Sequence, residues 1–227
     1  MPTSTWHNLG PQRRDRVMRS AMTEFGRHGF SGGSLNVIAR DAGVAKGSLF
    51  QYFEDKLDLF GTVCDEASRR IRTDMEPRLL ALGAGRPFFA FLTDALDAWI
   101  RYFADHPLER GVTAATNLEH DSAVRAAVRH VAHRHYLEVL RPLTDEARAR
   151  GELRPDIDTE AFLTLLLLLL PHLALAPYIA GLDPLLGLYG RGPDELRPQV
   201  HRLVDLLRAA VGSPARTAPA TPKGARS

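Results

Sequence analysis

The sequence predicts an all-α protein with a small three-helix domain at its N-terminus and a larger helical bundle behind it. Apolar residues recur with the 3.6-residue period of a helix over most of the 227 residues. No stretch shows the strict alternation of a half-buried strand. The composition, 44% hydrophobic and 25% charged, is that of a globular protein long enough to bury a sizeable core.

Composition and pattern divide the chain into four parts. We expect a disordered arm over residues 1–11 and a compact first domain over residues 12–60. A helical second domain follows over residues 61–212. Residues 213–227 are rich in Pro, Ala and basic side chains without any periodicity, which predicts a disordered basic tail.

Several classes of protein are disfavoured by what the sequence lacks. The one cysteine, Cys64, cannot form an internal disulfide, and residues 1–20 lack the apolar segment of a signal peptide. We therefore expect a cytoplasmic, nucleoid-associated protein. No nucleophile elbow, phosphate loop or metal-ligand set is recognisable, so we expect no catalytic residues, no cofactor and no metal. His130 and His133 share a helix face, but no Cys or carboxylate joins them at ligand spacing.

Charge is distributed unevenly along the chain. Residues 1–50 carry seven basic and three acidic side chains, a net charge of +4, whereas the formal net charge of the whole chain is only +2. A basic N-terminal part ahead of a more acidic remainder suggests that the first domain meets a polyanion.

The first domain is predicted to hold three helices. A long one over residues 12–29 has an apolar stripe and ends at Gly29. Ser34 is placed to cap a second, short helix. Gly43 separates it from a third helix over about residues 45–53, because glycine suits a turn that needs positive φ.

Two short helices meeting steeply at a glycine are typical of a helix-turn-helix, which presents its second helix to the major groove of DNA. Lysine and exposed N–H groups at the start of that helix suit phosphate, glutamine suits adenine, and phenylalanine suits the thymine methyl. We expect Tyr52 and Lys56 to contact phosphates. The predicted DNA-contacting residues are Ser34, Lys46, Gly47, Ser48, Phe50, Gln51, Tyr52 and Lys56.

Some of these residues have a structural alternative. Phe50, Tyr52 and Phe53 can all fill the core of a small helical domain, and for Phe53 we expect that role. Arg13, Arg14 and Arg16 form either a basic arm beside DNA or an ordinary solvated charge run; both readings remain open.

The stretch from about Gln12 to Phe60 resembles the DNA-binding domain of TetR-family transcriptional regulators. The resemblance rests on Ala21, Phe25, Gly29, Phe30, Ile38-Ala39, Ala42-Gly43-Val44, Gly47-Ser48-Leu49-Phe50-Gln51-Tyr52-Phe53, Lys56 and Leu59. Ser34-Leu35-Asn36 departs from the usual Thr-rich start, and Glu54-Asp55 precedes the lysine. The resemblance implies an all-helical homodimer, usually a repressor, that a small ligand in the C-terminal domain releases from its operator.

The second domain also reads as helical. We expect helices over residues 87–105 and 122–150, followed by a linker over 151–158. An apolar run covers residues 161–182, and an amphipathic helix follows over 194–211.

One predicted helix of the second domain is rich in aromatic residues and could form the wall of an apolar ligand pocket. Ordinary core packing is the alternative for each of these residues. Histidines elsewhere in the second domain could add polar groups to the lining. The predicted pocket residues are Phe88, Phe91, Trp99, Tyr102, Phe103, His120, His135 and His172.

The apolar run over residues 161–182 is long enough to cross a membrane, which needs about 20 residues. Pro171, His172 and Pro177 interrupt it and no basic cluster flanks it, so we expect no membrane span. We expect it to pair with the helix over 194–211 in a four-helix interface between two copies.

A dimer would place two reading helices on paired half-sites, which predicts a palindromic double-stranded DNA operator. The sequence thus predicts a DNA-binding regulator that is not an enzyme, most simply a repressor released by a small, largely apolar or aromatic ligand. The alternative is an activator or architectural protein that needs no small-molecule effector.

Overall fold

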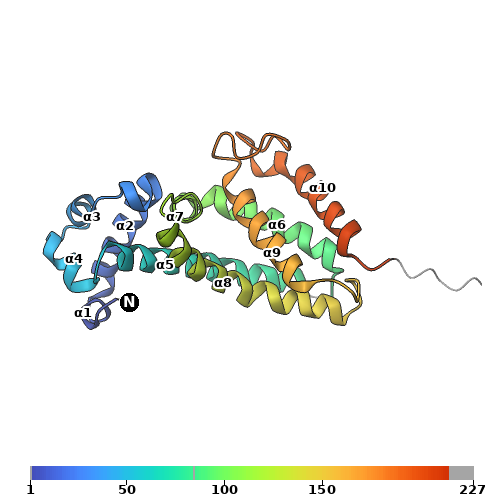
Figure 1. Ribbon diagram of the computed structural model, residues 1–227, viewed down its shortest axis with the longest axis horizontal. Coiled ribbons are helices and arrows are strands. Elements are labelled where there is room, and N and C mark those ends of the chain that lie inside the picture. Colours follow the sequence, from blue (N-terminus) through green and yellow to red (C-terminus); the bar gives the residue numbers. More distant parts are fainter. Residues whose placement is uncertain (1, 84, 215–227) are drawn as a thin grey trace, which may run out of the picture.

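The computed structural model describes residues 2–83 and 85–214, and Figure 1 shows that the helices form two parts. The helices are α1 (Ser4–His7), α2 (Pro11–Gly32), α3 (Leu35–Asp41), α4 (Lys46–Tyr52), α5 (Lys56–Gly83), α6 (Phe88–Asp105), α7 (Pro107–Asn117), α8 (Ser122–Ala149), α9 (Thr159–Leu175) and α10 (Pro193–Val211). We call α1–α4 with the start of α5 the head, and the bundle of α5–α10 the body. The predicted all-α class is confirmed.

The local signals in the head act as the sequence predicts. Gly29 (φ 66°) breaks the end of α2, and Gly43 (φ 66°) makes the turn between α3 and α4. The Ser34 side chain accepts a hydrogen bond from the Val37 N–H (3.5 Å) and caps α3. Asp55 accepts from the Asp58 N–H (2.7 Å) at the start of α5. These caps fix the starts of α3 and α5, whose first N–H groups have no partner within the helix.

Residues 1–11 are not the disordered arm that the sequence predicts, as far as the structure describes them. Residues 4–7 form α1, and Trp6 is buried, with its ring 4.8 Å from that of Phe53 and 6.0 Å from that of Tyr52. The Thr3 N–H donates to the Tyr52 carbonyl (3.0 Å) and its hydroxyl to the Gln51 carbonyl (2.6 Å). A single large aromatic side chain in a polar segment carries this packing, and periodicity cannot reveal it.

The head and the body share one continuous helix. The predicted domain boundary between residues 60 and 61 falls inside α5, which runs from the head along the body (Figure 1). The hydrophobic core of the head includes Val63 and Ala67 from α5 and Val112 and Ala115 from α7. Because α5 and α7 contribute side chains to this close-packed core, a displacement of either helix in the body also displaces residues of the head.

Helix α7 is an element that the sequence analysis missed. His106-Pro107 ends α6 as expected, but the chain then turns into a new helix, since Pro107 suits a first helical position. Helix α7 crosses α2 at two glycines: a Cβ on Gly111 would lie 3.1 Å from the Gly26 Cα. The two backbones touch there because neither residue has a side chain.

The end of the body differs from the prediction at α9. The helix ends at Leu175, well before the end of the apolar run at residue 182, and Leu165 and Leu168 on it are exposed. The last helix, α10, agrees with its predicted range of 194–211. No helix within residues 2–83 and 85–214 is long and apolar enough to span a membrane. Most of the predicted tail, residues 215–227, lies outside the described residues.

Candidate functional site

Helix α4 is held rigidly at one end of the molecule (Figure 1). Its inner face buries Leu49, and Phe53 directly after it is also buried. The Val44 N–H donates to the Ala39 carbonyl (2.9 Å), which closes the turn between α3 and α4. The head therefore holds α4 in one orientation and leaves one face of it exposed, as a helix-turn-helix must.

The free face of α4 carries residues of the kinds that read DNA. Lys46, Gly47, Phe50 and Gln51 are exposed, and the spacing i, i+1, i+4, i+5 puts them on one side of the helix. Half of the Phe50 side chain remains in water. A cation, an amide and an apolar ring on one face can together contact phosphate, a base edge and a thymine methyl.

Gly47 has no role in the packing of the head. Apart from its chain neighbours and the backbone of its own helix, no atom of the described residues lies within 4 Å of the position that its Cβ would take, and its backbone is helical. Glycine inside a helix costs about 1 kcal/mol relative to alanine. Because nothing within the head requires this cost, the open space above Gly47 suits close approach by a molecule from outside.

Tyr52 does not lie where the sequence prediction puts it. Its side chain is 3% exposed and is covered by Trp6, so it belongs to the scaffold behind α4. The prediction that it faces solvent for phosphate contact is wrong in this respect, because it left out the packing of α1. Phe53, expected in the core, is there.

The other predicted contacts are only partly available to DNA. Ser48 and Ser34 are half-buried, and the Ser34 hydroxyl caps α3. The Lys56 ammonium points into the protein: it donates to the Ser31 carbonyl (3.4 Å) and lies 4.8 Å from the centre of the Phe30 ring. Burial lowers the pKa of Lys56, against the opposing influence of Glu119 and Glu24. Lys56 thus stabilises the end of α2 from within.

Glu119, in the loop between α7 and α8, joins the body to the head. Its buried carboxylate accepts hydrogen bonds from the Phe30 N–H (3.0 Å) and the Ser31 hydroxyl (2.9 Å) of the head. Two N–H groups of its own loop, on His120 and Asp121, donate to it as well. Burial alone would raise the pKa of Glu119, but these hydrogen bonds outweigh burial and lower it.

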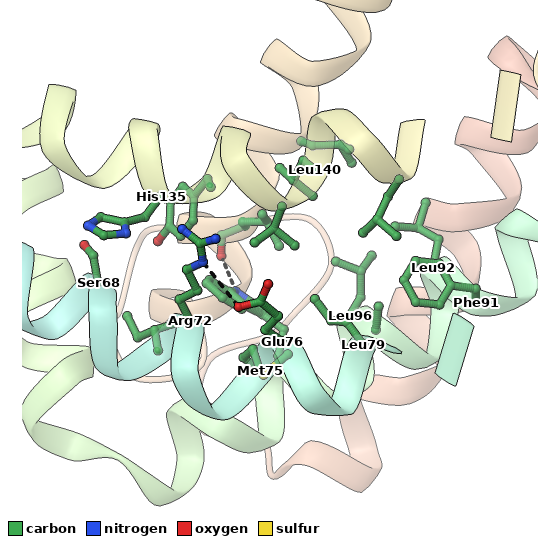
Figure 2. Close-up of a pocket in the computed structure, with 18 residues that line it drawn as sticks. Ser68, Arg72, Met75, Glu76, Leu79, Phe91, Leu92, Leu96, His135 and Leu140 are labelled. Carbon is green, nitrogen blue, oxygen red and sulfur yellow. Dashed lines mark hydrogen bonds and ion pairs between the residues drawn. The ribbon is translucent and has the colours of Figure 1, made fainter. Parts of the chain in front are cut away.

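A second feature of the body is an apolar cavity of about 80 Å³ between α5, α6, α8 and α9. Figure 2 shows Ser68 and His135 at one end of it and Phe91 with Leu92 at the other, while Met75 and Leu79 lie along α5. Its surface is almost wholly carbon. Such a wall favours apolar molecules, since it offers few partners to polar ones.

Only part of the predicted pocket set lines this cavity. Phe91, Trp99 and His135 do so. The residues that do not are Phe88, Tyr102, Phe103, His120 and His172. A helix with six aromatic residues must turn some of them away from any one cavity, and these fill the core: the Tyr102 ring stacks on that of His106 at 3.9 Å. His120 is exposed near the head, and His172 is half-buried in the last turn of α9.

Several positions at the cavity and between head and body are not recognisable from the sequence. The spacing of Ile71, Met75 and Leu79 predicts one apolar face of α5, but nothing local shows that this face borders a cavity. The same is true of Tyr136 and Leu140, which lie one turn apart on α8: their spacing predicts an apolar helix face, but not that this face borders the cavity. Glu119 reads as one more charged loop residue, and only the fold brings it to Phe30.

Parts of the sequence are similar to those of known proteins. Residues 17–63 match the family model described as bacterial regulatory proteins of the tetR family. The chain is 28% identical over 153 residues to the HTH-type transcriptional regulator SrpR of Pseudomonas putida, which covers 66% of this chain and 67% of that protein. It is 27% identical over 152 residues to the transcriptional repressor NicS of P. putida, over 63% of this chain and 67% of NicS. The head of the chain thus matches the tetR family, and the similar curated proteins are HTH-type transcriptional regulators.

The structural likeness to known proteins extends beyond the matched segment. Its structure resembles the fatty acid degradation regulator FadR of Bacillus halodurans with a TM-score of 0.68 and 21% identity, covering 87% of this chain and 96% of that one. It also resembles FadR of Bacillus subtilis in complex with stearoyl-CoA, with a TM-score of 0.66 and 16% identity over 84% of this chain and 96% of that one. At these identities the likeness concerns the fold alone. The relatives are transcriptional regulators and not enzymes, as the sequence predicts.

Proposed function

We propose that this regulator is a homodimeric repressor that reads a palindromic operator with α4 and leaves it when a small, largely apolar ligand occupies the body. The observation that carries the DNA-reading step is the outward face of α4 with Lys46, Gly47, Phe50 and Gln51 on a rigid scaffold. The repressor NicS, a relative over the larger part of its length, supports the sign of the regulation.

The dimer part of the proposal rests on α9 and α10. Leu165 and Leu168, one turn apart on α9, expose 51% and 59% of their surface, and Leu206 on α10 exposes 67%. Exposed leucines on two helices in the region predicted for pairing support burial against a second copy. Figure 1 places α10 at the far end from α4, so the two heads of such a dimer would lie apart and could reach separate half-sites.

The proposed release step runs through α7. The cavity borders α5 and α8, and α7 lies against both of these helices and crosses α2 at Gly26 and Gly111. Glu119 then ties the end of this segment to Phe30 and Ser31 in the head. A ligand that binds one arrangement of α7 more tightly than another would shift the spacing of the two α4 helices.

One observation favours the alternative of a regulator without an effector. The cavity of about 80 Å³ is smaller than most ligand sites, which measure about 300–1,000 Å³. Either the body opens further when a ligand enters, or the cavity is only a packing defect.

A gel-shift experiment on the DNA flanking the chain's own gene separates these readings. Repressor function predicts a retarded band that a subset of apolar and aromatic compounds removes. A band that no compound affects would support the effector-free regulator, and a protein that retards no such fragment would contradict the proposed operator.

A Leu165→Glu/Leu168→Glu variant tests the dimer. In analytical ultracentrifugation this variant should sediment as a monomer, whereas the unaltered protein should sediment as a dimer.

A further inference from the structure

The charged groups around the cavity are already neutralised by the protein. The Arg72 guanidinium donates to Glu76 (Nε–Oε2 3.4 Å, Figure 2). It also donates to Glu138 on α8. The His135 Nε2 is paired with the Asp65 carboxylate (3.0 Å), which in turn pairs with Arg69 and Arg134. An entering anion would find one guanidinium between two carboxylates, and so no cation free to receive it.

The apolar part of the lining has no free donor either. The Trp99 indole N–H donates to the Leu170 carbonyl (2.8 Å), so it is already satisfied. Two hydroxyl groups and one ring nitrogen differ from the rest. Within the described residues, nothing forms a hydrogen bond with the hydroxyl of Ser68, that of Tyr136 or the buried Nδ1 of His135, and all three side chains line the cavity. Burial raises the pKa of Tyr136, so its hydroxyl remains a neutral donor and acceptor.

These two hydroxyls mark the end of the cavity that faces the head. Ser68 and Tyr136 also line a small adjoining void of about 20 Å³, whose other walls include Thr113 and Thr116 of α7. Both threonine-bearing turns lie on the helix that crosses α2. A polar group of a ligand bound at Ser68 and Tyr136 would therefore lie at the end of the cavity next to α7, where it could displace that helix.

We infer that the cavity selects a neutral amphiphilic molecule, with an apolar body among α5, α6, α8 and α9 and one uncharged hydroxyl or carbonyl group at Ser68 and Tyr136. This inference rests on the proposed ligand-responsive function and adds the ligand's chemical class. It excludes carboxylates and other anions, because burying a charge without a partner is far more costly than burying a hydroxyl that is hydrogen-bonded.

The test compares three probes of the same shape by calorimetric titration of the full-length protein at neutral pH. They are 4-ethylphenol, ethylbenzene and 4-ethylbenzoate, which differ in bearing a hydroxyl, nothing or a carboxylate. We expect 4-ethylphenol to bind about tenfold more tightly than ethylbenzene, since a net hydrogen bond contributes about 0.5–1.5 kcal/mol and 1.4 kcal/mol is a factor of ten. 4-Ethylbenzoate should bind at least about 100-fold more weakly than the phenol.

Two double variants complete the experiment. Ser68→Ala/Tyr136→Phe should remove the advantage of the phenol and leave the affinity for ethylbenzene unchanged. Thr73→Val/Tyr189→Phe removes one aliphatic and one phenolic hydroxyl from exposed positions and should behave as the unchanged protein. Benzoate binding as tight as that of the phenol, or a phenol advantage that survives in the first variant, would overturn the inference.

The same titrations separate this inference from the proposed function. If no probe binds although the protein still retards its DNA, the ligand class is contradicted while the proposed DNA-reading function stands. If 4-ethylphenol binds as expected but does not release the DNA, the ligand class stands and the repressor-release function fails.

Discussion

Both the head and the body pack aromatic rings in their cores, but the body also encloses an apolar cavity between long helices. The head is a small core in which aromatic rings touch, with Phe25 and Phe60 at 4.9 Å and Trp6 and Phe53 at 4.8 Å between ring centres. In the body, four helices, α5, α6, α8 and α9, leave a cavity between them. A close-packed core transmits force with little deformation, whereas a cavity gives its walls room to rearrange.

The difference in packing suits the head to reading DNA and the body to sensing a ligand. A DNA reader must hold α4 in one geometry, and the aromatic packing of the head does this. A sensor must have two arrangements of similar free energy, which an underfilled bundle permits more readily. The crossing at Gly26 and Gly111, with the Glu119 hydrogen bonds beside it, is where the two parts meet.

The largest expected effect comes from opening the core of the head. Phe60 is fully buried, so Phe60→Ala should lower the free energy of unfolding by about 3–5 kcal/mol and abolish DNA binding. Phe50→Ala, on the exposed face of α4, should change stability by less than about 0.5 kcal/mol while weakening DNA binding. Urea denaturation and fluorescence anisotropy on labelled operator DNA measure the two quantities. Equal stability losses in both variants would contradict the rigid head.

The second effect concerns Trp6, which lies outside the matched family segment. Trp6→Ala should cost about 3 kcal/mol of stability and weaken DNA binding, because α1 no longer supports Tyr52 and Phe53. Trp6→Phe should recover most of both. Ligand titrations of the body should be unaffected by either change. A Trp6→Ala protein with unaltered DNA affinity would show that α1 is dispensable for reading.

The third effect is a pH dependence at the junction. The pKa of Glu119 is lowered in the folded protein from its ordinary value of 4.5, so its stabilising contribution is present above that value and is lost as pH falls through the folded pKa. Glu119→Gln should cost about 1–2 kcal/mol at neutral pH and flatten the acid limb of the stability curve. Thermal unfolding from neutral to acidic pH measures this. Parallel curves for the two proteins would remove Glu119 from the junction.

The smallest effect should have opposite signs for stability and binding. Gly47→Ala should stabilise the head by about 0.5–1 kcal/mol, because alanine favours a helix and meets no atom there. The same methyl group should weaken DNA binding if DNA approaches Gly47 closely. Gly43→Ala is the contrasting variant: it should destabilise, since that residue has φ 66°. A Gly47→Ala protein that binds DNA as before would exclude close approach at this position.

The sequence predicts local features well and non-local ones poorly. Ser34, Gly29 and Gly43 act through their own backbones, so their roles follow from residue type and position alone. Tyr52 was misplaced because Trp6 covers it, and that contact depends on a segment without periodicity. The cavity walls share the apolar pattern of any core helix, so Phe91 could not be distinguished from Phe88 before the helices were assembled.

The most direct test of the account is a selection of DNA sites from a random duplex library by the full-length protein. We predict enrichment of an inverted repeat whose half-sites lie about one helical turn, or a multiple of it, apart. Lys46→Ala/Gln51→Ala should enrich nothing although its melting temperature is unchanged, because both side chains are exposed. If the unaltered protein enriches no repeat, or the double variant enriches the same one, α4 is not the DNA-reading helix.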